Sequence, residues 1–265
     1  MNTHAPSPLT AVFDAVGLRI LGLLSQAGDY AIITGRAFRA IFRRPFDLTN
    51  LIRQFHAVGV QSLPIIVLTS MAVAMVFAVQ LIVGFRQFQA EAMASQVEGL
   101  AVVRELAPVI TGLMMAGRVG SAMAAELGTM QVTEQIDALE CLATDPIHYL
   151  FVPRILAAAV MVPLLTAVAI YVGYCGGYLI LVGAEGQGAF VFRTEFFKLL
   201  DSKDFLIALT KALVFGLIIA TVGCWRGYRT FGGAEGVGHA PTSSVVTSSL
   251  WVLIADFFLT KLLLI

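Results

Sequence analysis

The chain contains five stretches that are long and apolar enough to cross a bilayer, and these stretches limit what it can fold into. The hydrocarbon core of a membrane needs about 20 apolar residues in helical form. Residues 57–85 carry no charge, and four more stretches follow: 97–125, 147–184, 205–225 and 242–264. Because lipid cannot hydrogen-bond exposed backbone groups, spans of this length are helical. We therefore predict an all-α integral membrane protein that forms a single domain over residues 1–265.

The composition agrees with this class and excludes several others. Hydrophobic residues make up 58% of the chain and charged residues only 13%, whereas a soluble domain carries about 25% charge. Lys plus Arg and Asp plus Glu each number 17, so there is no basic excess of the kind that nucleic-acid binding needs. The sequence contains no P-loop and no metal-ligand spacing. We expect neither a metal site, a cofactor nor an ATP site in this chain.

The segment 8–44 precedes the first span and is interrupted by glycines and charges, so it is a poor candidate for a further span. Three arginines recur at helical spacing on one face, and three large apolar residues lie mainly on the other: Arg36, Arg39 and Arg43 against Phe38, Ile41 and Phe42. This pattern predicts a basic amphipathic helix in the membrane interface. A soluble cytoplasmic helix is the alternative.

Basic residues near the span ends predict the orientation. Most of them precede the first span or follow the second and fourth: Arg36, Arg39, Arg43, Arg44, Arg53, Arg118, Arg154, Arg226 and Arg229. The opposite side has only Arg86, Arg193, Lys198 and Lys203. We expect the N-terminus in the cytoplasm and the C-terminus outside.

The largest cytoplasmic connection, between the second and third spans, has the pattern of a short amphipathic helix over residues 129–143. Apolar Ile136 and Leu139 alternate there with Glu134, Asp137 and Glu140. An acidic helix held at the membrane surface would suit docking of a partner, although a helix that only packs on the bundle would give the same pattern. Asp145 and Pro146 then read as the N-cap and first residue of the third span.

Four charged residues fall inside the predicted spans, where ionisable groups are costly and indicate function by default. They are Arg104, Glu105, Lys211 and Asp256, all at about the same depth from the outer side. Two positive and two negative charges would cancel. We predict that Arg104 pairs with one of the others and that Glu105 lines a cavity, on the same helix face as Glu98. A purely structural role for all four is the alternative.

For two further patterns, an aromatic stripe and a ridge of small residues, the sequence does not decide what the side chains contact. Phe77, Leu81, Phe85 and Phe88 recur at helical spacing and would face either acyl chains in a cavity or ordinary lipid. Small residues recur every four positions at Gly112, Ala116 and Gly120. Such a ridge permits close helix packing, either within the chain or across a dimer axis.

Several motifs resemble the MlaE/YrbE permease family, and the resemblance is dense over residues 100–160. They are 104–109 (RELAPV), 116–122 (AGRVGSA), 125–130 (AELGTM), 133–138 (TEQIDA), Asp145-Pro146 and Pro153-Arg154. Members are permease subunits of MCE-type lipid ABC transporters. The loop 86–96 and the glycine-rich turn near residue 232 depart from much of the family.

The resemblance implies a function, partners and a site. The permease would be a homodimer in a bacterial inner membrane that moves phospholipid to or from a periplasmic MCE-domain protein. A separate ATPase would bind ATP and Mg, often with a small STAS-domain protein attached. A coupling helix would dock on that ATPase through Thr133, Glu134, Ile136, Asp137, Leu139 and Glu140. Lipid would occupy a cavity between protomers lined by Glu105, Arg104, Phe77, Gly84, Phe85 and Phe88.

A different class of function is also open on the residues alone. The chain would then be a membrane scaffold that transports nothing, or an intramembrane enzyme that modifies lipid. An enzyme would have to use Glu105, Lys211 or Asp256, and no activating motif accompanies them. The absence of a transit-like extension favours a bacterial source.

Overall fold

The computed structural model describes residues 8–42 and 47–264, and every regular element within these ranges is helical. Five helical segments are long and apolar enough to cross a membrane: Leu48–Arg86, Glu91–Val132, Ile147–Ala184, Ser202–Tyr228 and Gly233–Leu263. The predicted all-α membrane architecture with five spans is confirmed. Arg43 and Arg44, two of the residues used to predict orientation, lie outside the described residues.

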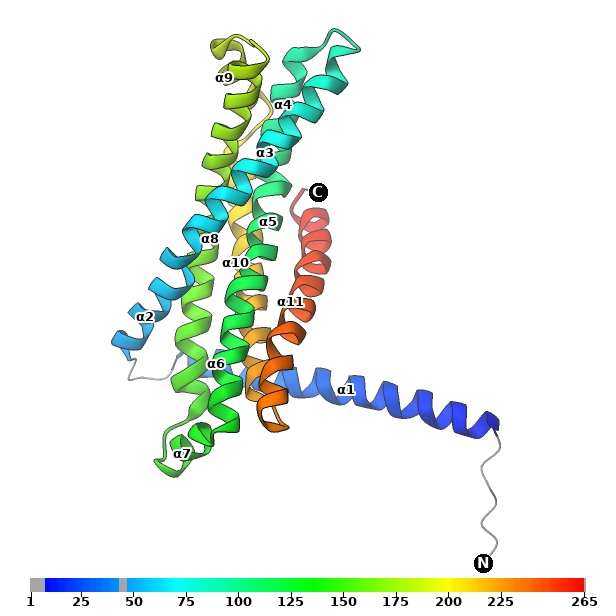
Figure 1. Ribbon diagram of the computed structural model, residues 1–265, viewed down its shortest axis with the longest axis vertical. Coiled ribbons are helices and arrows are strands. Elements are labelled where there is room, and N and C mark those ends of the chain that lie inside the picture. The colour runs from blue at the N-terminus through cyan, green and yellow to red at the C-terminus, as the bar shows by residue number, and fades with distance from the viewer. Residues whose placement is uncertain (1–7, 43–46, 265) are drawn as a thin grey trace, which may run out of the picture.

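The spans stand side by side in one bundle (Figure 1). The first comprises α2 (Leu48–Val58), a 3-10 turn and α3 (Leu63–Arg86). The second runs through α4 (Glu91–Ala101), α5 (Ala107–Met115) and α6 (Ser121–Val132). The third is centred on α8 (Val152–Tyr178), and the last two are α10 (Ser202–Tyr228) and α11 (Gly233–Leu264). The helix α8 packs on α3 and α10 and forms the centre of the core.

Most spans are longer than hydropathy predicts. The second begins at Glu91 rather than at residue 97 and ends at Val132 rather than at residue 125. It is also interrupted by two π-helical turns, Val102–Leu106 and Ala116–Gly120. Helical hydrogen bonds continue past the charged residues at which an apolar window stops, so the helices project beyond the apolar stretches.

The N-terminal helix α1 (Pro8–Ala40) is continuous despite its glycines and crosses the bundle close to the end that carries α7 (Figure 1). Arg229 Nε and Trp225 Nε1 donate to Asp29 Oδ2 at 2.7 and 3.0 Å. Tyr30 stacks edge-on against Trp225, with ring centroids 5.4 Å apart. Hydrogen bonding to Arg229 holds the pKa of Asp29 below its usual value. These contacts fix α1 across the base of α10.

The connection between the second and third spans is not one helix over 129–143. The helix α6 ends at Val132, Glu134 adopts a left-handed φ of 58°, and α7 (Gln135–Cys141) follows in a new direction. Thr133 and Glu134 therefore form a corner rather than part of the helix. Asp145 Oδ1 accepts the amide hydrogen of Ile147 at 3.1 Å, and Pro146 is helical. The predicted cap of the third span is confirmed.

The small-residue ridge packs within the chain. A Cβ added at Gly112 would lie 3.0 Å from Phe215 and 3.1 Å from Val252, and one at Gly120 would lie 3.3 Å from Ile219. The neighbours belong to α10 and α11, so the ridge lets these two spans approach the second span closely. Of the two alternatives that the sequence left open for the ridge, the structure shows packing within the chain.

Candidate functional site

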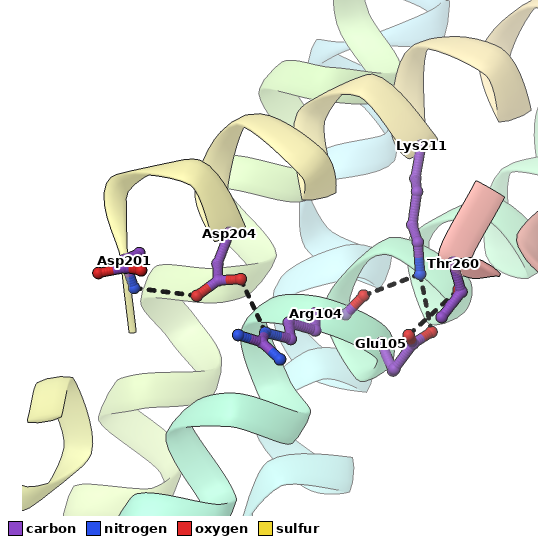
Figure 2. A network of polar contacts seen from close by, with 6 residues as sticks. All are labelled: Arg104, Glu105, Asp201, Asp204, Lys211 and Thr260. Carbon is purple, nitrogen blue, oxygen red and sulfur yellow. Dashed lines mark hydrogen bonds and ion pairs between the residues drawn. The ribbon is translucent and has the colours of Figure 1, made fainter. Parts of the chain in front are cut away.

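The amine of Lys211 is the centre of a polar cluster among the spans (Figure 2). Its side chain is completely buried. The Nζ atom donates to Glu105 Oε2 at 2.9 Å and to the carbonyl oxygen of Arg104 at 3.1 Å. Asp256 Oδ1 lies 3.0 Å from Nζ as an ion pair, although it is not aligned for a hydrogen bond. Three spans therefore meet at one buried cation.

Arg104 pairs with a residue that the sequence analysis did not select. Its Nε donates to Asp204 Oδ1 at 2.7 Å, and the other oxygen of Asp204 accepts the amide hydrogen of Asp201 at 2.9 Å (Figure 2). Asp204 thus caps the start of α10 and binds Arg104 at once. Hydropathy excluded Asp204 because the predicted span began at residue 205, but the spacing Asp201-x-x-Asp204 before an apolar run is a capping signal that would have found the helix start.

Asp204 also changes the charge of the cluster. Two cations, Arg104 and Lys211, face three carboxylates, Glu105, Asp204 and Asp256. The four charges selected from the sequence sum to zero, and Asp204 at the start of α10 brings the formal sum of the cluster to 2 − 3 = −1. Arg104 and Asp204 neutralise each other as an ion pair. The excess negative charge therefore lies where Lys211 alone faces both Glu105 and Asp256.

The backbone around Arg104 explains how its carbonyl reaches Lys211. Arg104 and Glu105 lie in the π-helical turn Val102–Leu106, and such turns are frequent at functional sites. Pro108 follows four residues after Arg104 and has no amide hydrogen to give to that carbonyl. The released acceptor binds Lys211 instead. The motif RELAP therefore provides two acceptors for Lys211, one from a side chain and one from the backbone.

Glu105 is the exposed member of the cluster. Its side chain is 39% exposed, compared with 18% for Asp256 and 4% for Asp204. Its second oxygen accepts a hydrogen bond from Thr260 Oγ1 at 3.2 Å. Glu105 is consequently held in place from two spans and still faces outward, as a residue that contacts a ligand would.

Glu98 does not share this face, although it lies seven residues before Glu105. Its carboxylate is buried against α8, where a Cβ added at Gly177 would lie 2.1 Å from Oε1. Within the described part of the chain, neither Glu98 oxygen has a hydrogen-bond partner. The intervening π-helical turn Val102–Leu106 has more residues per turn than an α-helix and so shifts the faces on either side of it, and the expected common face is wrong.

Of the span-one residues predicted for the same cavity, Phe85 packs elsewhere, whereas Phe88 and Gly84 have open surroundings. Phe85 packs on an outer hydrophobic cluster that includes Phe192 and Phe196. Phe88 is 78% exposed and lies beyond the end of α3, so it does not continue the helical stripe that begins at Phe77. A Cβ added at Gly84 would meet nothing within 4 Å. One chain alone therefore does not bring these residues to Glu105.

The short helix α7 lies at one end of the bundle (Figure 1), and acidic residues in and next to it are exposed. Ile136 is buried and Leu139 half-buried, whereas Glu134, Asp137 and Glu140 are exposed. Apolar anchoring on one side and free carboxylates on the other fit a surface that a partner contacts. Among the residues that the structure describes, no group of three His, Cys, Asp or Glu side chains is placed to hold a metal ion.

An all-helical membrane protein with a charged cluster where its spans meet is the class that the fold and site define. A family model described as Permease MlaE matches residues 51–262. The chain belongs to this family, and it is a transporter permease subunit rather than an enzyme. Permeases of ABC transporters work with an ATPase partner.

Several curated relatives agree with this assignment. A probable ABC transporter permease protein of Rickettsia felis is 41% identical over 254 residues, which cover 96% of this chain and 98% of the relative. Another from Synechocystis sp. is 43% identical over 231 residues, 87% of this chain and 88% of the relative. The chloroplastic protein TRIGALACTOSYLDIACYLGLYCEROL 1 of Arabidopsis thaliana is 39% identical over 230 residues, 87% of this chain and 66% of the relative.

Proposed function

We propose that this permease moves phospholipid and that Glu105 contacts the lipid during transfer. The observation that carries the proposal is the placement of Glu105, anchored by Lys211 and Thr260 yet 39% exposed. A charged and partly exposed side chain favours a polar headgroup over bare acyl chain beside it. The Arabidopsis relative is named after a galactolipid, which supports a lipid as the substrate.

The permease would act as a homodimer, with α11 close to the partner protomer. In the most apolar 18-residue stretch of α11, only 11% is buried within the protein, compared with 50% in the corresponding stretch of α10. Its exposed side chains include Leu250, Trp251, Ile254, Phe257 and Phe258. A second copy would cover this face and enclose the space beside Glu105, and Phe77, Gly84 and Phe85 would reach the lipid only from that assembly.

The other partners complete the cycle. An ATPase would bind ATP and Mg and dock on α7 in the cytoplasm, and closure of the ATPase would move the spans through Thr133 and Glu134. An MCE-domain protein would exchange lipid on the periplasmic side, and a STAS-domain protein would bind the ATPase. In this arrangement α1 lies in the inner leaflet interface of a bacterial inner membrane, and the C-terminus faces the periplasm.

The decisive experiment measures phospholipid transfer by the complex reconstituted with its ATPase and MCE-domain protein. Glu105→Gln should lower transfer about tenfold or more, the loss expected for one charge-assisted hydrogen bond. The matched control is Glu91→Gln, an exposed carboxylate whose ion pair among the described residues is with Arg86 in the outer turn. Transfer by Glu105→Gln at the wild-type rate would contradict the assignment.

Docking on α7 has a separate test. The double change Glu134→Lys and Asp137→Lys reverses two exposed charges without touching buried Ile136, so the permease should fold but retain much less ATPase on co-purification. Glu235→Lys, an exposed residue near the turn between α10 and α11, is the control. Normal ATPase recovery with the double variant would remove α7 from the interface.

A further inference from the structure

A cavity of about 640 Å³ lies where α8, α10 and the outer helix α9 (Ala189–Lys198) meet. This volume is within the range of about 300–1,000 Å³ that small-molecule sites occupy. None of its lining residues belongs to the Lys211 cluster. No helix was predicted for residues 189–198, so α9 and this cavity are new features of the structure.

Aromatic rings build the walls. Tyr171, Tyr174 and Tyr178 recur at i, i+3 and i+7 on α8 and therefore share one face. Tyr174 packs against Phe196 and Phe197 of α9, with ring centroids 5.0 and 5.6 Å apart. These contacts fix α9 beside α8 and so form one wall of the cavity.

The cavity lies at the depth of the outer membrane boundary. The interfacial helix α1 contacts α10 at Trp225. Phe205, which lines the cavity, lies 20 residues before Trp225, toward the N-terminal end of α10. That length of helix spans about 30 Å, the thickness of the hydrocarbon core. Tyrosine is favoured at this depth because its ring is apolar and its hydroxyl polar.

One cation faces this aromatic surface. Arg193 is the single charged residue among the described residues that line the cavity. It is exposed, and none of the ion pairs between described residues involves it. Its neighbour on the same helix, Lys198, is instead bound to Glu195 at 3.0 Å. A free guanidinium matches the geometry of a phosphate with two parallel hydrogen bonds.

We propose that this cavity binds one phospholipid from the outer leaflet, separately from the Glu105 site. The phosphate would bind Arg193, and an acyl chain would lie along Tyr171 and Phe205 toward the membrane centre. Tyr171 is 68% exposed and Phe190 82% exposed, an aromatic patch of the kind that marks a binding surface. The inference rests on the membrane placement given under the proposed function, but not on lipid transport.

The test uses the full-length protein in nanodiscs with a diazirine-bearing phosphatidylcholine, and mass spectrometry locates the label. Wild-type protein should be labelled within residues 167–178 and 189–197. Arg193→Gln should reduce this labelling about fivefold or more, as expected for loss of a charged hydrogen bond. Lys198→Gln is the matched control and should keep it. Equal labelling of wild type and Arg193→Gln would overturn the proposal.

Other probes separate the possible occupants. A diazirine-bearing diacylglycerol with the same acyl chains should label the cavity more weakly, and inorganic phosphate should not compete. Equal labelling by diacylglycerol would mean that the cavity binds acyl chains without recognising the phosphate, and it would overturn the proposal. Absence of label from folded wild-type protein would overturn the proposal.

A last variant distinguishes this proposal from the transport proposal. Glu105→Gln should lose lipid transfer but keep the label at residues 189–197. If Glu105→Gln transfers lipid normally, the transport site is wrong and the outer cavity stands. If Glu105→Gln removes the label, the two sites are one and the separate cavity site is wrong.

Discussion

Glu98 and Glu105 are two acidic residues on one span, and they differ in burial and in hydrogen-bond partners. Glu98 is fully buried, and the described residues offer its oxygens no hydrogen-bond partner. Glu105 is 39% exposed and is bound by Lys211 and Thr260. Burial without partners is costly for a carboxylate, whereas partners combined with exposure let a charge persist at a membrane surface or cavity.

The difference teaches that spacing on a helix is not enough to place a side chain. Seven residues would put the two glutamates on one face of a regular α-helix. The π-helical turn Val102–Leu106 lies between them and changes the rotation. Glu98 consequently faces Gly177 of α8, and Glu105 faces Lys211 of α10.

The largest expected effect comes from removing the cation. Lys211→Met leaves Glu105 and Asp256 without their shared partner in the core, and breaking a buried ion pair costs about 3–5 kcal/mol. Unfolding in mixed SDS micelles should show this loss. Lys203→Met, an exposed change on the same helix, should cost little. Similar stability of both variants would contradict the central role of Lys211.

A second change tests the packing around Glu98. A Cβ at Gly177 would lie 2.1 Å from Glu98 Oε1, so Gly177→Ala should destabilise the protein by about 1–3 kcal/mol through overpacking. Gly183→Ala is the control, because nothing lies within 4 Å of a Cβ there. Combining Gly177→Ala with Glu98→Ala should recover part of the loss, and strict additivity would disprove the contact.

A matched pair of neutral substitutions compares the two glutamates directly. Glu105→Gln weakens the bond to Lys211 and should cost about 1–2 kcal/mol, reduced by its exposure. Glu98→Gln removes no ion pair between described residues and replaces a buried carboxylate that has no hydrogen-bond partner there, so it should not lower the free energy of unfolding. The same micellar unfolding measurement checks both, and the reverse order would refute the comparison.

The smallest effect concerns the second anchor of Glu105. Thr260→Val removes the hydrogen bond from Thr260 Oγ1 to Glu105 Oε1 and should cost about 0.5–1 kcal/mol. Thr210→Val is the control, because Thr210 Oγ1 donates to the carbonyl oxygen of Leu206 within its own helix. If both variants unfold alike, Thr260 does not hold Glu105.

Much of the fold was predictable from local physics. Five apolar stretches led to five spans, the Asp145-Pro146 pair led to a helix start, and membrane cost selected Arg104, Glu105, Lys211 and Asp256. These are properties of single segments or single residues, and they do not depend on tertiary contacts. The outer helix α9 was missed because its composition is mixed and no strong apolar window contains it.

The amino-acid sequence by itself determined the class of the protein, its number of spans and the few charges that must be accommodated among them. Only the tertiary structure decided which charges meet. Arg104 binds Asp204, Lys211 joins three spans, and Glu98 turns toward Gly177 because helix rotation and packing set these contacts over separations of about 45 to 110 residues. Hydropathy and spacing describe one helix at a time, whereas an ion pair between spans depends on how two helices are placed together.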